Sequence, residues 1–99
     1  MNEIQFVGSH NSYKQRMPFL YFWSLRLIDG EVAKALDYWH PPISDQLELG
    51  LRKLELDFFY DAVSREFPVG HIQVIDMETS CTSLRACLRE IREWSDRNP

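Results

Sequence analysis

A single alternating stretch, from Leu51 to Phe59, restricts most strongly what this chain can fold into. Apolar and charged residues alternate along it, with Leu54, Leu56 and Phe58 on one face of the predicted strand and Lys53, Glu55 and Asp57 on the other. Residues two apart on a strand lie about 7 Å from each other, so Glu55 and Asp57 repel unless a cation lies between them. The charged face is therefore either a salt-bridged surface or a metal and acid–base site. Lys53 either contacts a phosphate or neutralises Glu55, and we favour the second interpretation.

Length and charge limit the classes of protein to consider. The chain has 99 residues, enough for one small domain or for a piece of a larger one. Its hydrophobic content of 44% indicates a globular protein. A net charge of -4 argues against a nucleic-acid partner, whose phosphates require an excess of Lys and Arg. Phosphate-bearing substrates remain compatible, because a bound divalent cation can reverse the local field.

Membrane and export signals are not evident in the sequence. No stretch reaches the roughly 20 consecutive apolar residues that a membrane span needs, and the first residues lack the charged and apolar regions of a signal peptide. Cys81 and Cys87 allow one disulfide or two thiols, so cysteine count does not indicate a compartment. If the loop before the last helix folds back, they come close enough for a bridge, which would stabilise by roughly 2 kcal/mol.

The first half of the chain combines a short strand with a long aromatic segment. Residues 4–8 are predicted to form a strand that ends in a polar turn containing His10, the usual place for chemistry in α/β proteins. Residues 13–30 are predicted to form an irregular loop packed over a core, with Met17–Pro18 breaking any helix. The alternative is a lipid-facing rim, because the run from Phe19 to Trp23 is almost wholly aromatic and apolar.

The remaining pattern predicts helices and a further strand. We expect helices over 31–38, over a short segment from about Ser44 that Gly50 caps, and from the N-cap Ser83 to about Ser95, and a strand over 67–75. His40, just before two prolines, is interpreted as a structural loop residue. If the strands over 51–59 and 67–75 are neighbours, His71 faces the same side as Glu55 and Asp57.

The order of these elements is strand, long loop with helices, strand, strand, helix. This order fits the first elements of an α/β barrel and does not fit a small domain that is complete in itself. A (β/α) barrel takes about 250 residues. We therefore expect residues 1–99 to be the N-terminal part, roughly a third, of a single barrel domain.

Four motifs occur in order along the chain: Gly8–Tyr13 (GSHNSY), Leu36–Tyr38 with His40–Pro42, Asp45–Leu47, and Gly50–Asp57 (GLRKLELD). Together they resemble the phosphatidylinositol-specific phospholipase C superfamily, most closely its calcium-dependent bacterial and fungal branch. Later residues also look like that branch, namely Cys81, Cys87–Leu88, Trp94–Asp96 and Asn98–Pro99. The resemblance runs from about Val7 to the last residue.

The resemblance implies an incomplete phosphodiesterase TIM barrel that hydrolyses a phosphoric diester of a phospholipid. It implies that His10 and His71 are the catalytic acid–base pair and that Asn11, Glu55 and Asp57 bind Ca²⁺, which prefers hard oxygen donors. In the family, the inositol 2-hydroxyl attacks phosphorus and the diacylglycerol alkoxide leaves. Family members are usually secreted, which favours a bridge between the cysteines, and contact with a membrane surface follows from the lipid substrate.

The chain also departs from the family, and two other functions remain open. Family members complete the calcium shell with a carboxylate from a later strand that no residue here clearly matches, so we expect this polypeptide alone to be weakly active or inactive. One alternative is an enzyme resembling glycerophosphodiester phosphodiesterases or sphingomyelinase D, although those glycerophosphodiesterases usually carry Arg-Gly where Asn11–Ser12 stands. The other is a non-catalytic copy that binds lipid headgroups or a partner through 19–23.

Overall fold

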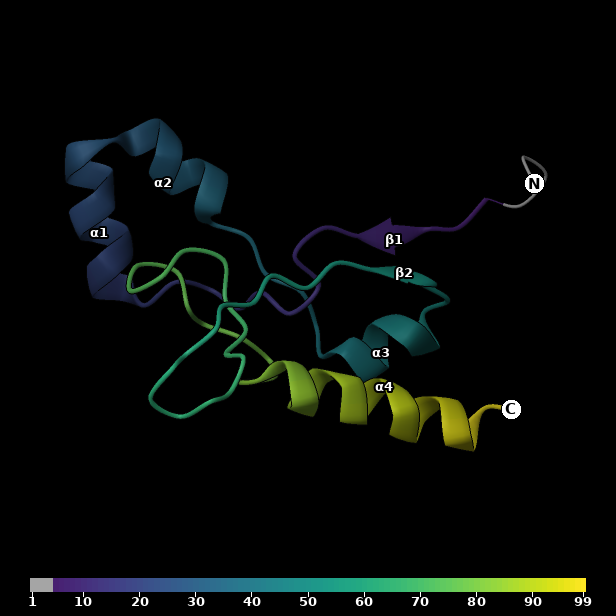
Figure 1. The fold of residues 1–99 in the computed structure, drawn as a ribbon. Coiled ribbons are helices and arrows are strands. Elements are labelled where there is room, and N and C mark those ends of the chain that lie inside the picture. Colours follow the sequence, from purple (N-terminus) through teal and green to yellow (C-terminus); the bar gives the residue numbers. More distant parts are fainter. Residues whose placement is uncertain (1–4) are drawn as a thin grey trace.

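The computed structural model describes residues 5–99, and these form a mixed α/β arrangement (Figure 1). The described elements are β1 (Gly8–Ser9), α1 (Phe19–Ile28), α2 (Gly30–Leu36), α3 (Ile43–Glu48), β2 (Lys53–Leu54) and α4 (Leu84–Arg97). The two strands pair in parallel, with Gly8 opposite Lys53 and Ser9 opposite Leu54. Ile4, where the first predicted strand begins, lies outside the described residues. Within 5–99, no helix is both long and apolar enough to cross a bilayer.

The parallel pair depends on a very close approach of two backbones. A Cβ atom added at Gly8 would lie 2.6 Å from the Cβ of Lys53 and 2.8 Å from its carbonyl oxygen. Only glycine fits there without separating the strands. The predicted strand over 51–59 was too long, since only Lys53 and Leu54 pair with a neighbouring strand. Its alternation is nevertheless visible, because Leu54 and Leu56 pack against the core.

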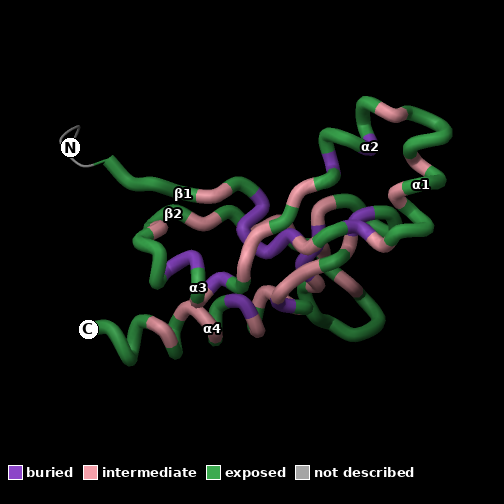
Figure 2. Tube along the Cα trace, turned by 180° about the vertical axis from the view of Figure 1, so that it is seen from behind, coloured by how far each residue is buried: buried purple, intermediate pink, exposed green. Residues whose placement is uncertain are grey.

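The predicted irregular loop over 13–30 is wrong in its second half, which is helix α1. Pro18 does not break this helix, because it stands directly before the first helical residue, where its missing N–H is not needed. The carbonyl of Pro18 accepts the first helical bond, from the N–H of Phe22 at 3.0 Å. Helix α2 begins at the next cap, where the Asp29 carboxylate accepts from two backbone N–H groups. No residue of α1 is buried, and Figure 2 shows the helix exposed along most of its length.

The predicted strand over 67–75 is also wrong. In its place the chain makes isolated antiparallel bridges, of Phe58 with Val69 and of Ile72 with Asp76. A continuous strand is prevented because Pro68 has no N–H to donate and because Val74 has a φ of 70°. The chain turns back after His71 and does not continue as a strand.

The core lies between α3, α4 and the segments that connect the strands. Its buried cluster comprises Tyr13, Ile43, Leu47, Val69, Cys81 and Cys87. The predictions of α2, α3 and α4 are confirmed, and Gly50 follows α3 with a φ of 95°, the left-handed conformation expected of a C-cap.

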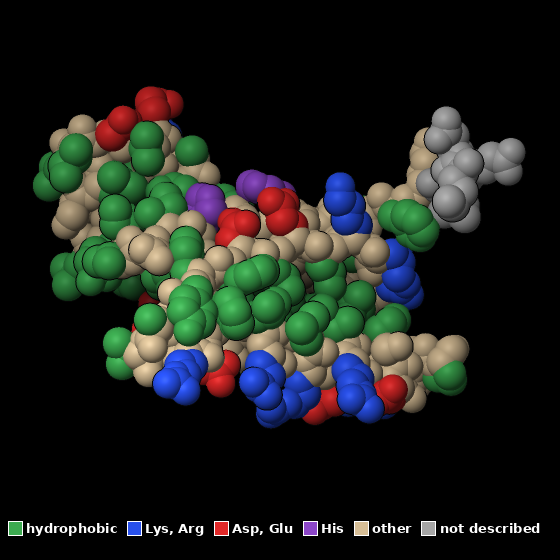
Figure 3. Space-filling view, viewed as in Figure 1, with side chains coloured by type: hydrophobic (Ala, Val, Ile, Leu, Met, Phe, Trp, Pro, Cys, Tyr) green, Lys and Arg blue, Asp and Glu red, His purple; other side chains and the backbone are tan. Residues whose placement is uncertain are grey.

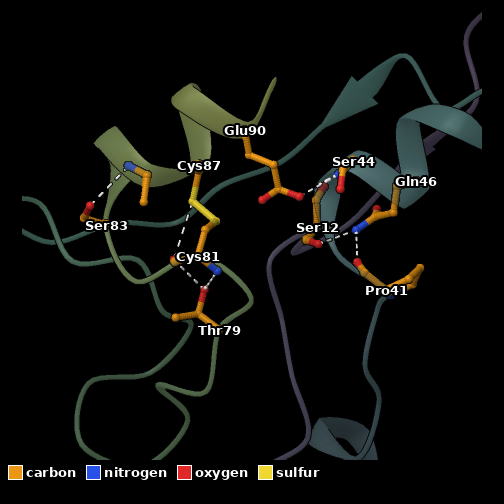
Figure 4. Close-up of a disulfide and its surroundings, with 10 residues drawn as sticks. Ser12, Pro41, Ser44, Gln46, Thr79, Cys81, Ser83, Cys87 and Glu90 are labelled. Atoms are coloured by element: carbon orange, nitrogen blue, oxygen red, sulfur yellow. Dashed lines mark hydrogen bonds between the residues drawn. A yellow bond between two sulfur atoms is a disulfide. The ribbon is translucent and has the colours of Figure 1, made fainter. Parts of the chain in front are cut away.

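Helix α4 is fixed at its start and ties down α3. The Ser83 hydroxyl accepts from the N–H of Ala86 at 3.2 Å, as predicted for its N-cap. Cys81 and Cys87 form a disulfide that joins the preceding loop to the first turns of this helix (Figure 4). The Glu90 carboxylate accepts from the N–H of Ser44 at 2.8 Å, so α4 caps α3, whose own N-cap is a proline without a side-chain bond.

Candidate functional site

The turn that carries His10 and Asn11 is fixed to the chain at Glu55. The N–H of Ser12 donates to the Glu55 carbonyl at 2.9 Å, and the N–H of Glu55 donates to the Ser12 hydroxyl at 2.8 Å. Gln46, which is buried, donates from its amide to the Ser12 carbonyl at 2.6 Å (Figure 4). The turn and the segment after β2 are therefore held in one register.

His10 and Glu55 face each other at the surface of this turn. The Nε2 atom of His10 lies 3.7 Å from a carboxylate oxygen of Glu55, and both side chains are exposed, by 72% and 48%. The side chain within ion-pair distance of Glu55 is therefore His10, and the structure, which describes both residues, gives no such contact between Lys53 and Glu55. The ring of His40 contacts the backbone of the same turn, with its Nε2 atom 2.9 Å from the carbonyl oxygen of His10. The interpretation of His40 as a structural residue is therefore confirmed.

Asn11 and Asp57 are joined through the hydroxyl of Tyr13. This hydroxyl lies 3.1 Å from Asp57 Oδ2 and 3.3 Å from Asn11 Oδ1. Burial raises the pKa of Tyr13 well above its usual range, and the charge of Asp57 raises it further, so the phenol keeps its proton and donates. The Asn11 amide donates to the Tyr38 hydroxyl at 2.6 Å. Asn11 adopts a φ of 50°, a left-handed conformation that asparagine tolerates.

Sequence reasoning missed the part of Tyr13 and Tyr38 in the site. Tyr13 stands two residues after Asn11 at the end of the GSHNSY motif, and Tyr38 lies within the second motif. Both positions were therefore available as signals. Their contacts, however, depend on how the loops pack and not on spacing along the chain.

His71 follows a backbone contact between Gly70 and Asp57. The N–H of Gly70 donates to the Asp57 carbonyl at 3.2 Å, which places His71 next to this segment. Its Nδ1 lies 3.1 Å from Asp76 Oδ2, and its side chain is 25% exposed. The segments 51–59 and 67–75 are neighbours, as expected, but they meet at an isolated bridge between Phe58 and Val69 and do not form a regular pair of strands. All five residues singled out from the sequence (His10, Asn11, Glu55, Asp57 and His71) thus belong to one connected region.

The site opens to solvent on one face of the molecule. A cavity of about 280 Å³ is lined by Phe6, Gly8, Ser9, His10, Lys53 and Glu55. Figure 3 shows histidine and acidic side chains side by side on this face, next to the helical pair α1–α2.

The oxygen donors suit a hard cation in kind but not in number. Asn11 and Asp57 both direct an oxygen at the Tyr13 hydroxyl, while Glu55 faces His10. Amide and carboxylate oxygens are the ligands that Ca²⁺ prefers, yet the ion takes about six to eight of them. In the described part of the chain, no group of three or more His, Cys, Asp or Glu side chains is placed to hold a metal ion. Further oxygens, from water or from other residues, are needed to complete a shell.

The chain matches a model of a protein family but no individual curated protein or solved structure. A family model described as "Phosphoinositide phospholipase C, Ca2+-dependent" matches residues 1–68. The matched segment includes His10, Asn11, Glu55 and Asp57, and His71 lies just beyond it. The chain therefore belongs to the calcium-dependent phosphoinositide phospholipase C family.

Proposed function

We propose that this chain is the N-terminal part of a phosphodiesterase barrel, with residues 1–99 in one domain, that cleaves the phosphodiester of a phosphoinositide. The observation that carries this proposal is the contact of His10 with Glu55, 3.7 Å apart and beside the network of Asn11, Tyr13 and Asp57. An exposed imidazole beside a carboxylate, with buried oxygen-bearing side chains behind them, supplies groups that phosphoryl transfer uses.

The two imidazoles take different parts in the proposed reaction. His10, exposed next to Glu55, contacts the phosphate and stabilises charge in the transition state. His71, protonated on both ring nitrogens with its Nδ1–H facing Asp76, gives the Nε2 proton to the leaving alkoxide. The proton of the attacking hydroxyl passes to the other imidazole, His10. The attacking group is a hydroxyl of the headgroup, as the family resemblance implies.

Asn11, Glu55 and Asp57 are the residues that would hold Ca²⁺. When bound, the ion would lower the pKa of the attacking hydroxyl and neutralise charge on the phosphoryl oxygens. The buried Tyr13 supports this assignment, since it orients Asp57 and Asn11 through one hydroxyl. Residues behind metal ligands commonly fix ligand orientation in this way.

Calcium binding can be tested by titration calorimetry. We expect CaCl₂ to bind the wild-type chain and the Glu93→Gln variant, because Glu93 lies exposed on α4. Binding should weaken strongly in Glu55→Gln and Asp57→Asn. Equal calcium affinity in all four proteins would refute the assigned ligands.

Catalysis is tested with phosphatidylinositol vesicles, by measuring headgroup release over hours because we expect slow turnover from an incomplete shell. Release should require Ca²⁺ and disappear in His10→Gln and in His71→Gln, while His40→Gln measures the effect of losing a structural imidazole. Release from glycerophosphodiesters or lysophospholipids in place of phosphatidylinositol would favour the alternative enzyme class. No release above the His10→Gln background would refute the proposed reaction.

The exposed apolar surface of α1 favours contact with a lipid surface. Phe19, Leu20 and Trp23 are exposed by 71%, 76% and 43%, and Arg26 stacks over the Trp23 ring at 4.9 Å. Aromatic and basic side chains together suit the interface of a bilayer. A Phe19→Ser/Leu20→Ser variant should sediment less with phosphatidylinositol vesicles than the wild type. Binding without catalysis would support the non-catalytic alternative.

The location that we propose is extracellular. The Cys81–Cys87 disulfide supports it, because such bridges persist in oxidising compartments. Labelling of free thiols in protein taken from its native source tests this. Reduced cysteines there would count against secretion.

A further inference from the structure

A buried ion pair lies directly behind His71. Lys14 Nζ is 3.2 Å from Asp76 Oδ1, and their side chains are exposed by only 1% and 0%. The second oxygen of the same carboxylate, Oδ2, lies 3.1 Å from His71 Nδ1. Asp76 therefore bridges a buried ammonium and a partly exposed imidazole, with one oxygen for each.

The ammonium of Lys14 is held from several sides. It donates to the Leu36 carbonyl at 2.8 Å and to the Tyr38 carbonyl at 3.3 Å, both just where α2 ends. It also lies 4.7 Å from the centre of the Tyr38 ring. An ammonium has three N–H donors, so Asp76 and these two carbonyls satisfy it. The position of the Asp76 carboxylate is thereby tied to the end of a helix and not left to a mobile side chain.

The main chain of Asp76 holds the backbone of His71 as well. Its carbonyl accepts from the N–H of His71 at 3.0 Å, and its own N–H donates to the Ile72 carbonyl at 2.9 Å. The turn between them contains Val74 at a φ of 70°, a conformation that costs energy for a β-branched residue. The turn thus retains a backbone conformation of higher energy than an unstrained turn. Such strained residues are found most often in segments that position functional groups.

The pair has no obvious purpose as a source of stability. Removing two charges from water is expensive, and buried ion pairs can often be replaced by apolar residues with no loss of stability. Here both charged side chains are almost completely removed from solvent, so both bear this cost. A role in orienting a neighbouring group accounts for it better than a role in folding.

We propose that Asp76 and Lys14 are positioning residues for His71. Asp76 accepts from the Nδ1–H of the ring, so the neutral imidazole carries its proton on Nδ1, and Nε2 is the nitrogen that can take up and release a further proton. Lys14 holds the carboxylate in place for that contact. The catalytic consequence rests on the proposed role of His71, but the effect on the ring does not.

Nuclear magnetic resonance measures the ring directly. Long-range ¹H–¹⁵N correlation spectra of the histidine-labelled chain, recorded where His71 is neutral, distinguish a proton on Nδ1 from one on Nε2. We expect Nδ1–H in the wild type and in Asp96→Asn, which removes an exposed carboxylate on α4. Asp76→Asn should shift the ring toward Nε2–H, because the new amide can donate to Nδ1, and Lys14→Met should give a mixture. An Nε2–H ring in the wild type, or spectra unchanged by Asp76→Asn, would overturn the proposal.

Two further measurements separate positioning from simple folding. The double variant Lys14→Met/Asp76→Leu removes both charges, and we expect it to keep its urea midpoint while losing the Nδ1–H signature. A double variant that keeps this signature overturns the proposal, because the ring then needs neither residue. If headgroup release is measurable, Asp76→Asn should lower kcat by at least about 100-fold with KM unchanged. The two results can also disagree: Asp76→Asn can change the tautomer of His71 and leave kcat unchanged. That outcome would support Asp76 as a positioning residue and refute the catalytic role of His71.

Discussion

Replacing Tyr13 by phenylalanine removes one oxygen atom from the centre of the candidate site. That hydroxyl donates to Asp57 at 3.1 Å and contacts Asn11 Oδ1 at 3.3 Å, and the side chain is fully buried. Hydrogen bonds to charged groups contribute about 1.5–3 kcal/mol, so we expect the free energy of unfolding to fall by about 2 kcal/mol. With a urea m-value of about 2 kcal/mol/M, the unfolding midpoint should fall by about 1 M.

The matched control is Tyr60→Phe, the same chemical change at a tyrosine that is 63% exposed. It should change the free energy of unfolding by less than about 0.5 kcal/mol. Because Tyr13 lies behind two assigned calcium ligands, its loss should also weaken calcium binding by about 10- to 100-fold in calorimetry. If Tyr13→Phe unfolds at the same urea concentration as Tyr60→Phe, the hydroxyl does not hold the site and this reasoning is refuted.

Three other predictions concern the frame of the site. Replacing both Cys81 and Cys87 by serine should lower the free energy of unfolding by about 2 kcal/mol, because their bridge closes a loop between residues six apart, and an unchanged urea midpoint would contradict this. Ser83→Ala should cost about 1 kcal/mol through loss of the α4 N-cap, measurable as reduced amide protection at the start of that helix. The Ser64 hydroxyl and two backbone N–H groups donate to the exposed carboxylate of Asp61 and lower its pKa. The resulting stabilisation of the fold is present above the unfolded-state pKa of Asp61 and is lost as pH falls through its folded-state pKa. Ser64→Ala should therefore raise the Asp61 pKa in an NMR titration.

The elements that the sequence predicts well are those with a local signal at both ends. Helix α4 has an apolar stripe and a serine cap, and α3 is followed by Gly50 in the left-handed conformation. Helix α1 has apolar residues on nearly every side, so it shows no helical period, and Pro18 was misinterpreted as a break. The segment 67–75 alternates like a strand but makes only isolated bridges and then turns back between Ile72 and Asp76, where Val74 has a φ of 70°.

Some residues of the candidate site can likewise be identified from the sequence, and others cannot. His10, Asn11, Glu55 and Asp57 lie in ordered motifs and are accessible from the sequence. The link from Lys14 to Asp76 is not, because it forms only when 13–15 lie against 78–80 through backbone hydrogen bonds. No pattern in a single sequence specifies that pairing.

Parallel pairing of β1 with β2 limits how quickly the candidate site can form during folding. Parallel strands cannot be joined by a tight turn, so the His10 turn meets Glu55 only after the long segment between them has closed into a loop. That closure costs entropy before any contact repays it, and contacts between distant segments form more slowly than helices do. The rate at which the candidate site forms is therefore set by how often two remote segments encounter each other, and faster helix formation would not accelerate it.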